Sequence, residues 1–128
     1  MSYGYTRVLK DTTMEDAETL IRKSLEDQGF GVLTEIDVKA TLKKKIGAEI
    51  DGYRILGACS PRHAHRAITA EPHIGVMLPC NVILRELPDG TEITAIDPVA
   101  SMSAVDNDEL MGIAAEVTEG LRKAVDRI

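Results

Sequence analysis

The hydrophobic and polar positions switch between strand and helix periods along the chain. Residues 3–9 alternate as in a short strand, and residues 14–25 repeat apolar side chains at helical spacing opposite a charged face. Asp11-Thr12-Thr13 offers caps for the start of this helix, and Thr12 with Glu15 matches a capping box. Gly29 suits a left-handed cap that ends it, with Phe30 folding back onto the last turn.

The next segment predicts a strand followed by a short, highly charged helix. Residues 32–36 form the strand, Asp37 caps a helix over residues 38–46, and Gly47 ends it. The triplet Lys43-Lys44-Lys45 lies on the outer face of this helix. Lysines near a helix C-terminus are favoured by its dipole, so we interpret the triplet as a solvated face rather than an anion-binding patch.

A continuous apolar run from Tyr53 to Ala58 predicts a strand that is buried on both faces. Ser60 is a good N-cap and Pro61 is favoured at the first helical position. We therefore expect the strand to pass directly into a helix at Cys59, and this helix to end at Glu71-Pro72.

The second half of the chain predicts more strands and one long helix. Residues 74–78 resemble a strand broken at Pro79, and residues 80–87 and 91–96 form a hairpin, after which Asp97-Pro98 opens a loop. A helix beginning at Asp106 or Asn107 carries a sustained apolar stripe, which we expect to cover the sheet. Its members are Leu110, Ala114, Val117, Leu121, Ala124 and Ile128.

These elements predict an α+β fold: a mixed, mainly antiparallel sheet with helices packed on it, in a single compact domain over residues 1–128. With 44% hydrophobic but only 3% aromatic residues, the core must be aliphatic. A net charge of −6 argues against nucleic acid or an anionic membrane as the main partner. The first residues lack an apolar leader and no run is long enough to span a membrane, so we expect a soluble, cytoplasmic protein with free thiols.

The two cysteines, Cys59 and Cys80, are the main candidates for chemistry. A thiol beside a helix N-terminus can have a lowered pKa, although cysteine is also a common buried hydrophobic residue. A metal site would need His63, His65 or His73 as further ligands. Because His63 and His65 are two positions apart on a helix and point in different directions, we expect no metal and no other cofactor.

Five blocks of sequence resemble one known family over nearly the whole chain. They are residues 35–38, 41–47, 53–61 (Y-R-I-L-G-A-C-S-P), 71–82 (E-P-H-I-G-V-M-L-P-C-N-V) and Asp97-Pro98. Their order and spacing are similar to those of the domain of unknown function 302 family of bacteria and archaea. The resemblance implies a compact α+β domain that often forms a homodimer. It implies no activity, cofactor or catalytic residue.

Three hypotheses about function follow. The first is a small-ligand-binding or sensing domain, and it is favoured over an enzyme because no catalytic motif is present. The second is a thiol-dependent sulfur or redox enzyme that uses Cys59, Cys80 or both. The third is a dimeric interaction module that uses the stripe of the last helix and has no pocket. In the small-ligand-binding hypothesis, the residues that frame the pocket are Cys59, Ser60, Pro61, His63, Pro79, Cys80 and Asn81.

Overall fold

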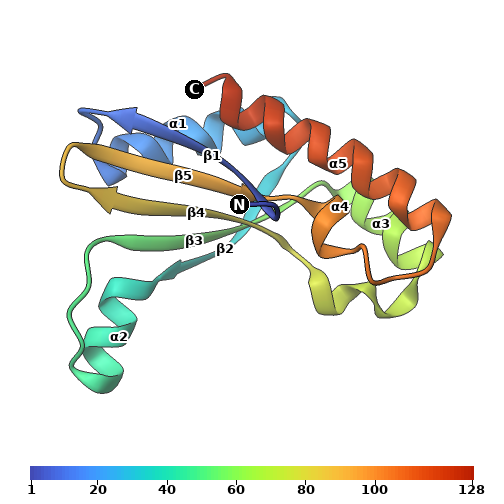
Figure 1. The fold of residues 1–128 in the computed structure, drawn as a ribbon, viewed down its shortest axis with the longest axis horizontal. Helices are drawn as coiled ribbons and strands as arrows, with labels where there is room; N and C mark the ends of the chain where they lie inside the picture. Colours follow the sequence, from blue (N-terminus) through green and yellow to red (C-terminus); the bar gives the residue numbers. More distant parts are fainter.

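Five strands pair in the order β1-β5-β4-β3-β2, and every neighbouring pair is antiparallel (Figure 1). The fold is taken from a computed structural model that describes all residues from 1 to 128. The strands are β1 (Gly4–Lys10), β2 (Gly31–Asp37), β3 (Tyr53–Cys59), β4 (Cys80–Leu87) and β5 (Gly90–Ile96). The predicted α+β class is confirmed, and the sheet is antiparallel throughout.

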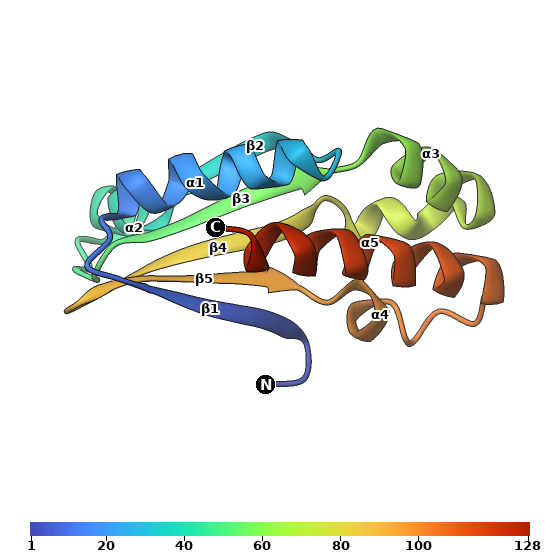
Figure 2. The ribbon, with the colours of Figure 1, turned by 90° about the horizontal axis from the view of Figure 1, so that it is seen from above.

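Two helices, α1 (Met14–Asp27) and α5 (Asp108–Asp126), cover one face of the sheet. Figure 2 shows them side by side over the strands, with α5 continuing past the end of the sheet toward α3 (Pro61–Ala70) and α4 (Pro98–Ser101). On β3, Leu56 lies buried beneath the helices, whereas Ile55 on the opposite face is only partly buried. The expectation that this strand is buried on both faces is therefore wrong.

The buried apolar side chains form two clusters. The larger cluster lies between the sheet, α1 and the C-terminal half of α5, and it contains residues such as Ile21, Leu84 and Leu121. The smaller cluster lies beyond the end of the sheet and consists of Ala67, Ile74, Met102, Leu110, Ile113 and Ala114. Helix α5 joins the two clusters, because its apolar stripe runs through both.

Several local predictions are confirmed at the level of single hydrogen bonds. Asp37 accepts a hydrogen bond from the Ala40 N–H (3.0 Å) and caps α2 (Val38–Ile46), which ends at Gly47 with φ 69°. Helix α1 ends as expected: Gly29 has a left-handed backbone conformation with φ 84°, and the Phe30 N–H donates a hydrogen bond to the Leu25 carbonyl. None of the α2 residues is buried, and this helix projects from the body of the molecule (Figure 1).

Of the caps expected at Asp11-Thr12-Thr13, the structure uses Thr13 and not the capping-box residue Thr12. The N-cap is Thr13, whose hydroxyl accepts from the Asp16 N–H (3.1 Å). The Thr12 hydroxyl instead donates to the Lys10 carbonyl (2.9 Å), so it is engaged in the turn that precedes the helix.

The strand predicted at residues 74–78 is also wrong. Residues Pro72–Met77 form a 3-10 helix, η1. Only Ile74 of this run enters the smaller cluster, while Val76 is 88% exposed. An apolar run of this length does not distinguish a strand from a helical turn, because both can bury a single anchor residue. Similarly, the loop expected after Asp97 contains the short helix α4, which Asp97 caps through the Val99 N–H (3.0 Å).

Candidate functional site

A cavity of about 300 Å³ lies where the two hydrophobic clusters meet. Its walls come from the end of β3, the start of β4, α3, the α4 region and the N-terminal half of α5. Fourteen of its 18 lining residues are hydrophobic. The full lining consists of Phe30, Leu33, Ala58, Cys59, Ser60, His63, Ala64, Ala67, Ile68, Leu78, Pro79, Cys80, Pro98, Met102, Leu110, Ile113, Ala114 and Val117. Two other hollows on the surface are lined mainly by polar residues, so this cavity is the candidate site for an apolar molecule.

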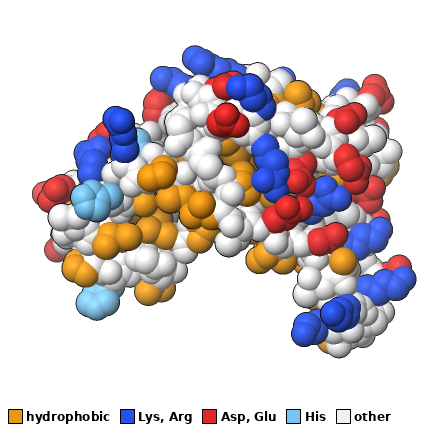
Figure 3. All heavy atoms as spheres, turned by 180° about the vertical axis from the view of Figure 1, so that it is seen from behind, with side chains coloured by type: hydrophobic (Ala, Val, Ile, Leu, Met, Phe, Trp, Pro, Cys, Tyr) orange, Lys and Arg blue, Asp and Glu red, His pale blue; other side chains and the backbone are white.

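The sequence builds this space by placing small residues where large ones would fill it. Ala64 and Ala67 on α3, Ala114 on α5 and Ala58 at the end of the sheet all line the cavity. Figure 3 shows hydrophobic side chains gathered on the half of the molecule that carries α3 and η1, while charged side chains dominate the other half. On the face shown, the hydrophobic side chains thus gather on the half of the molecule whose α3 contributes to the cavity wall.

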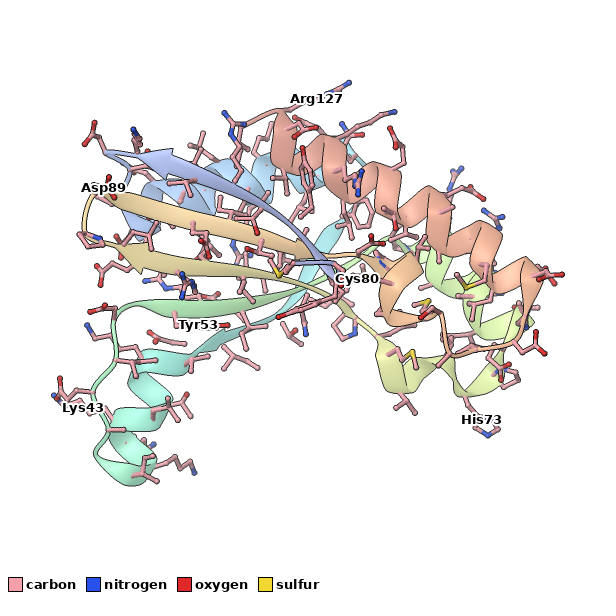
Figure 4. All side chains as sticks on the ribbon, viewed as in Figure 1. Lys43, Tyr53, His73, Cys80, Asp89 and Arg127 are labelled. Atoms are coloured by element: carbon pink, nitrogen blue, oxygen red, sulfur yellow. The ribbon has the colours of Figure 1, made fainter.

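The two cysteines come together at one edge of the cavity. Cys80 is the first residue of β4 (labelled in Figure 4) and pairs with Ala58, the residue before Cys59, so the two cysteines lie at the same end of the sheet. Both are free and both line the cavity. Burial raises the pKa of Cys59, and burial together with the charge of Cys59 raises the pKa of Cys80 to about 11. These directions are opposite to the lowered pKa that an activated thiol requires.

The polar end of the cavity is formed by Ser60 and His63. The Ser60 Oγ lies 2.7 Å from the His63 Nδ1, and the His63 Nε2 lies 3.4 Å from an oxygen of Glu116 on α5. Both terminal nitrogens of Arg66 donate to Glu116, at 3.0 Å each. The Arg66 guanidinium holds the pKa of the Glu116 carboxyl below its usual range, and His63 adds to this effect.

Most, but not all, of the residues expected at the pocket line the cavity. Cys59, Ser60, His63, Pro79 and Cys80 do so. Pro61 and Asn81 do not, and both are exposed. Pro61 is nevertheless the first residue of α3, as predicted.

The histidines are not gathered around an ion. His65 and His73 are exposed, and His73 is on η1, away from the cavity wall (Figure 4). No group of three His, Cys, Asp or Glu side chains is arranged to hold a metal. No helix is both long enough and apolar enough to cross a membrane.

Sequence reasoning missed the part of the cavity that α5 and α4 supply. Leu110, Ile113 and Met102 line it, and Glu116 joins the polar end from outside the cavity. The apolar stripe of α5 was the available signal, but its period alone does not show which residues face a cavity and which face packed neighbours.

The stripe itself belongs to the protein's own core. Leu121 is 1% exposed and Ala124 is fully buried, both in the larger cluster. The stripe is therefore not available as the contact surface of an interaction module, and that part of the third hypothesis is wrong.

Comparison with known proteins places the chain in a family. A search of the curated proteins found no match. The crystal structure of an uncharacterized conserved DUF302 protein from Bacillus stearothermophilus is similar, with a TM-score of 0.91 and 27% sequence identity over 99% of this chain and 98% of that one. A family model described as domain of unknown function DUF302 matches residues 5–128. The chain thus belongs to the DUF302 family.

Proposed function

We propose that this protein binds a small, largely apolar molecule in the cavity between the end of the sheet, α3 and α5. The observation that carries the proposal is the cavity itself, with 14 hydrophobic residues among the 18 that line it. Ligand pockets usually combine such a lining with a few polar groups that orient the ligand. Here Ser60 and His63 supply those groups at one end.

The size of the cavity supports a small ligand. Its volume of about 300 Å³ is at the lower end of the range for ligand sites. At about 30 Å³ for each water-sized group, it has room for roughly ten non-hydrogen atoms. An apolar cavity of half this size is known to accept benzene, which supports the proposal that this lining accepts a small apolar molecule.

The energetic cost of leaving the cavity empty also supports a ligand. Unfilled cavity volume costs about 24 cal/mol per Å³, which gives an upper limit of roughly 7 kcal/mol for a closed cavity of this size. That limit is comparable with the whole stability of an average domain, about 5–15 kcal/mol. A space of this size that stayed empty would cost stability, which supports the proposal that it holds a ligand.

The thiol-dependent alternative has less support. It requires a thiolate near neutral pH, whereas burial raises the pKa of both Cys59 and Cys80. The thiols are better understood as apolar parts of the cavity wall.

A titration with octan-1-ol, followed by methyl NMR, tests the proposal. We expect saturable shifts of the Leu110 and Ile113 methyl groups, which line the cavity, and none at Ile21, which lies in the closed part of the core. Equal shifts throughout the protein, or none at Leu110 and Ile113, would refute it.

A further inference from the structure

We propose that Ser60, His63 and Glu116 act as nucleophile, general base and orienting carboxylate, and that they hydrolyse an ester whose apolar acyl group occupies the cavity. This inference rests on the proposed binding function, because the cavity must hold the acyl group. It adds a reaction class and a substrate class to that site.

The first support is the chain of contacts among the three side chains. The Ser60 Oγ and the His63 Nδ1 are within hydrogen-bonding distance at 2.7 Å, and the His63 Nε2 is 3.4 Å from Glu116. In the tautomer that carries its hydrogen on Nε2, toward Glu116, the lone pair of Nδ1 can accept the proton of Ser60. A nucleophile, a base and a third group that orients the base are the arrangement needed to activate a hydroxyl.

The second support is that Ser60 departs from the usual role of a residue at its position. The N-caps of the other four α-helices, Thr13, Asp37, Asp97 and Asn107, all accept a hydrogen bond from a backbone N–H of their helix. Ser60 is the N-cap of α3 and makes no such bond, because its hydroxyl is paired with His63. A serine at this position usually stabilises its helix by capping it, and local rules are most often broken at functional sites.

This departure also leaves hydrogen-bond donors beside the nucleophile. The first N–H groups of a helix have no partner within the helix, and those of Arg62 and His63 receive no side-chain cap. Pro61 has no N–H to contribute. Backbone N–H groups at this position can stabilise the negative oxygen that forms when a carbonyl is attacked.

The third support is where the three side chains lie relative to the cavity. Ser60 and His63 line it, so an ester that places its acyl chain against Ile113 and Leu110 brings its carbonyl toward the polar end. Glu116 does not line the cavity and stays on the far side of His63, where Arg66 keeps it ionised. It is therefore a positioning residue.

The reaction balances with water as the co-substrate. The Ser60 oxygen attacks the ester carbonyl while its proton moves to the His63 Nδ1, and the tetrahedral intermediate then breaks the bond to the alkoxy oxygen. The leaving alcohol takes the proton from His63, and the acyl group stays on Ser60. Water attacks this acyl-enzyme, again giving a proton to His63, and a carboxylic acid is released with the hydroxyl of Ser60 restored.

Two measurements on the unmodified chain test the inference without relying on a variant. A fluorophosphonate probe is expected to label Ser60 selectively, as located by peptide mass spectrometry. p-Nitrophenyl octanoate is expected to be hydrolysed with saturation, and octan-1-ol should inhibit competitively. Labelling spread over exposed serines, or hydrolysis no faster than with a protein that lacks the cavity, would overturn the inference.

Variants then assign the roles. Ser60→Ala and His63→Gln should each reduce hydrolysis at least 100-fold, whereas Ser103→Ala, on an exposed serine, should leave it unchanged. Glu116→Gln should lower kcat about tenfold with little change in KM, because it disturbs the base and not the acyl chain. If Ser60→Ala hydrolyses at the unmodified rate, the inference is wrong. The same protein can still bind octan-1-ol, in which case the proposed binding function stands alone; if it does not bind, both fail.

Discussion

Ala114→Leu is expected to fill part of the cavity while leaving the fold intact. Ala114 lies on α5, is 2% exposed and lines the cavity. Leucine adds three carbon atoms, and each newly buried methylene contributes about 0.8 kcal/mol, so the gain is at most ~2 kcal/mol if the space is open. In a closed core, the same insertion would instead cost about 1–3 kcal/mol. The sign of the change therefore reports whether the space exists.

Ala124→Leu is the matched control. Ala124 is on the same helix and fully buried, but it belongs to the closed larger cluster and does not line the cavity. Its carbonyl also accepts the Ser24 hydroxyl, so α5 is held close to α1 at this point. We expect this variant to lose about 1–3 kcal/mol of stability.

Urea unfolding followed by circular dichroism measures both variants, and calorimetric titration with octan-1-ol measures binding. Ala114→Leu should be as stable as the unmodified chain or more stable, and it should bind octan-1-ol at least tenfold more weakly. The reasoning is refuted if Ala114→Leu is destabilised as much as Ala124→Leu, or if it binds the alcohol with unchanged affinity.

Three further predictions concern the core, the thiols and a charge network. Leu121→Glu should unfold the chain, because it places a carboxylate at a position that is 1% exposed; a folded variant in circular dichroism would show that α5 is not core. Burial and the charge of Cys59 raise the pKa of the Cys80 thiol from its ordinary value of 9.0 to about 11, so folding favours the neutral thiol. The free energy of unfolding should therefore fall as the pH rises from 9.0 to about 11. Cys80→Val should remove this part of the pH dependence, and fast alkylation of Cys80 in the native protein at neutral pH would contradict the assignment. Burial opposes ionisation of Glu18, but hydrogen bonds from Arg54 and Arg22 outweigh it and lower the pKa of the carboxyl. Glu18→Gln should thus cost ~0.5–1 kcal/mol at neutral pH. This loss should shrink as the pH falls below about 4, where the unfolded carboxyl takes up a proton, and it should vanish once the pH has also fallen through the lower pKa of the folded carboxyl; a pH-independent loss would contradict this.

Features encoded within a few neighbouring residues could be predicted from the sequence. Asp37 and Gly47 bound α2, Pro61 opens α3, and the Cys80–Ile96 hairpin turns as expected. Each depends on a short-range rule about backbone conformation or capping. The antiparallel pairing of β3 with β4 then brings Cys59 and Cys80 to one end of the sheet.

Features that depend on tertiary contacts could not be predicted. The run at residues 74–78 has the composition of a strand, but its place beyond the end of the sheet leaves Val76 exposed and anchors only Ile74. Glu116 is far from His63 in sequence, and one acidic residue on a charged helix face gives no signal of its partner. The homodimer that the family resemblance implies stays a prediction, which sedimentation at increasing concentration would test; the buried stripe of α5 does not form its interface.

The crystal structure of the protein soaked with octan-1-ol tests the central claim most directly. The account predicts density for one alcohol molecule in the cavity, with its chain against Ile113 and Leu110 and its hydroxyl toward Ser60 and His63. An empty cavity at saturating alcohol, a cavity closed by movement of α3 onto α5, or alcohol bound only elsewhere would contradict it.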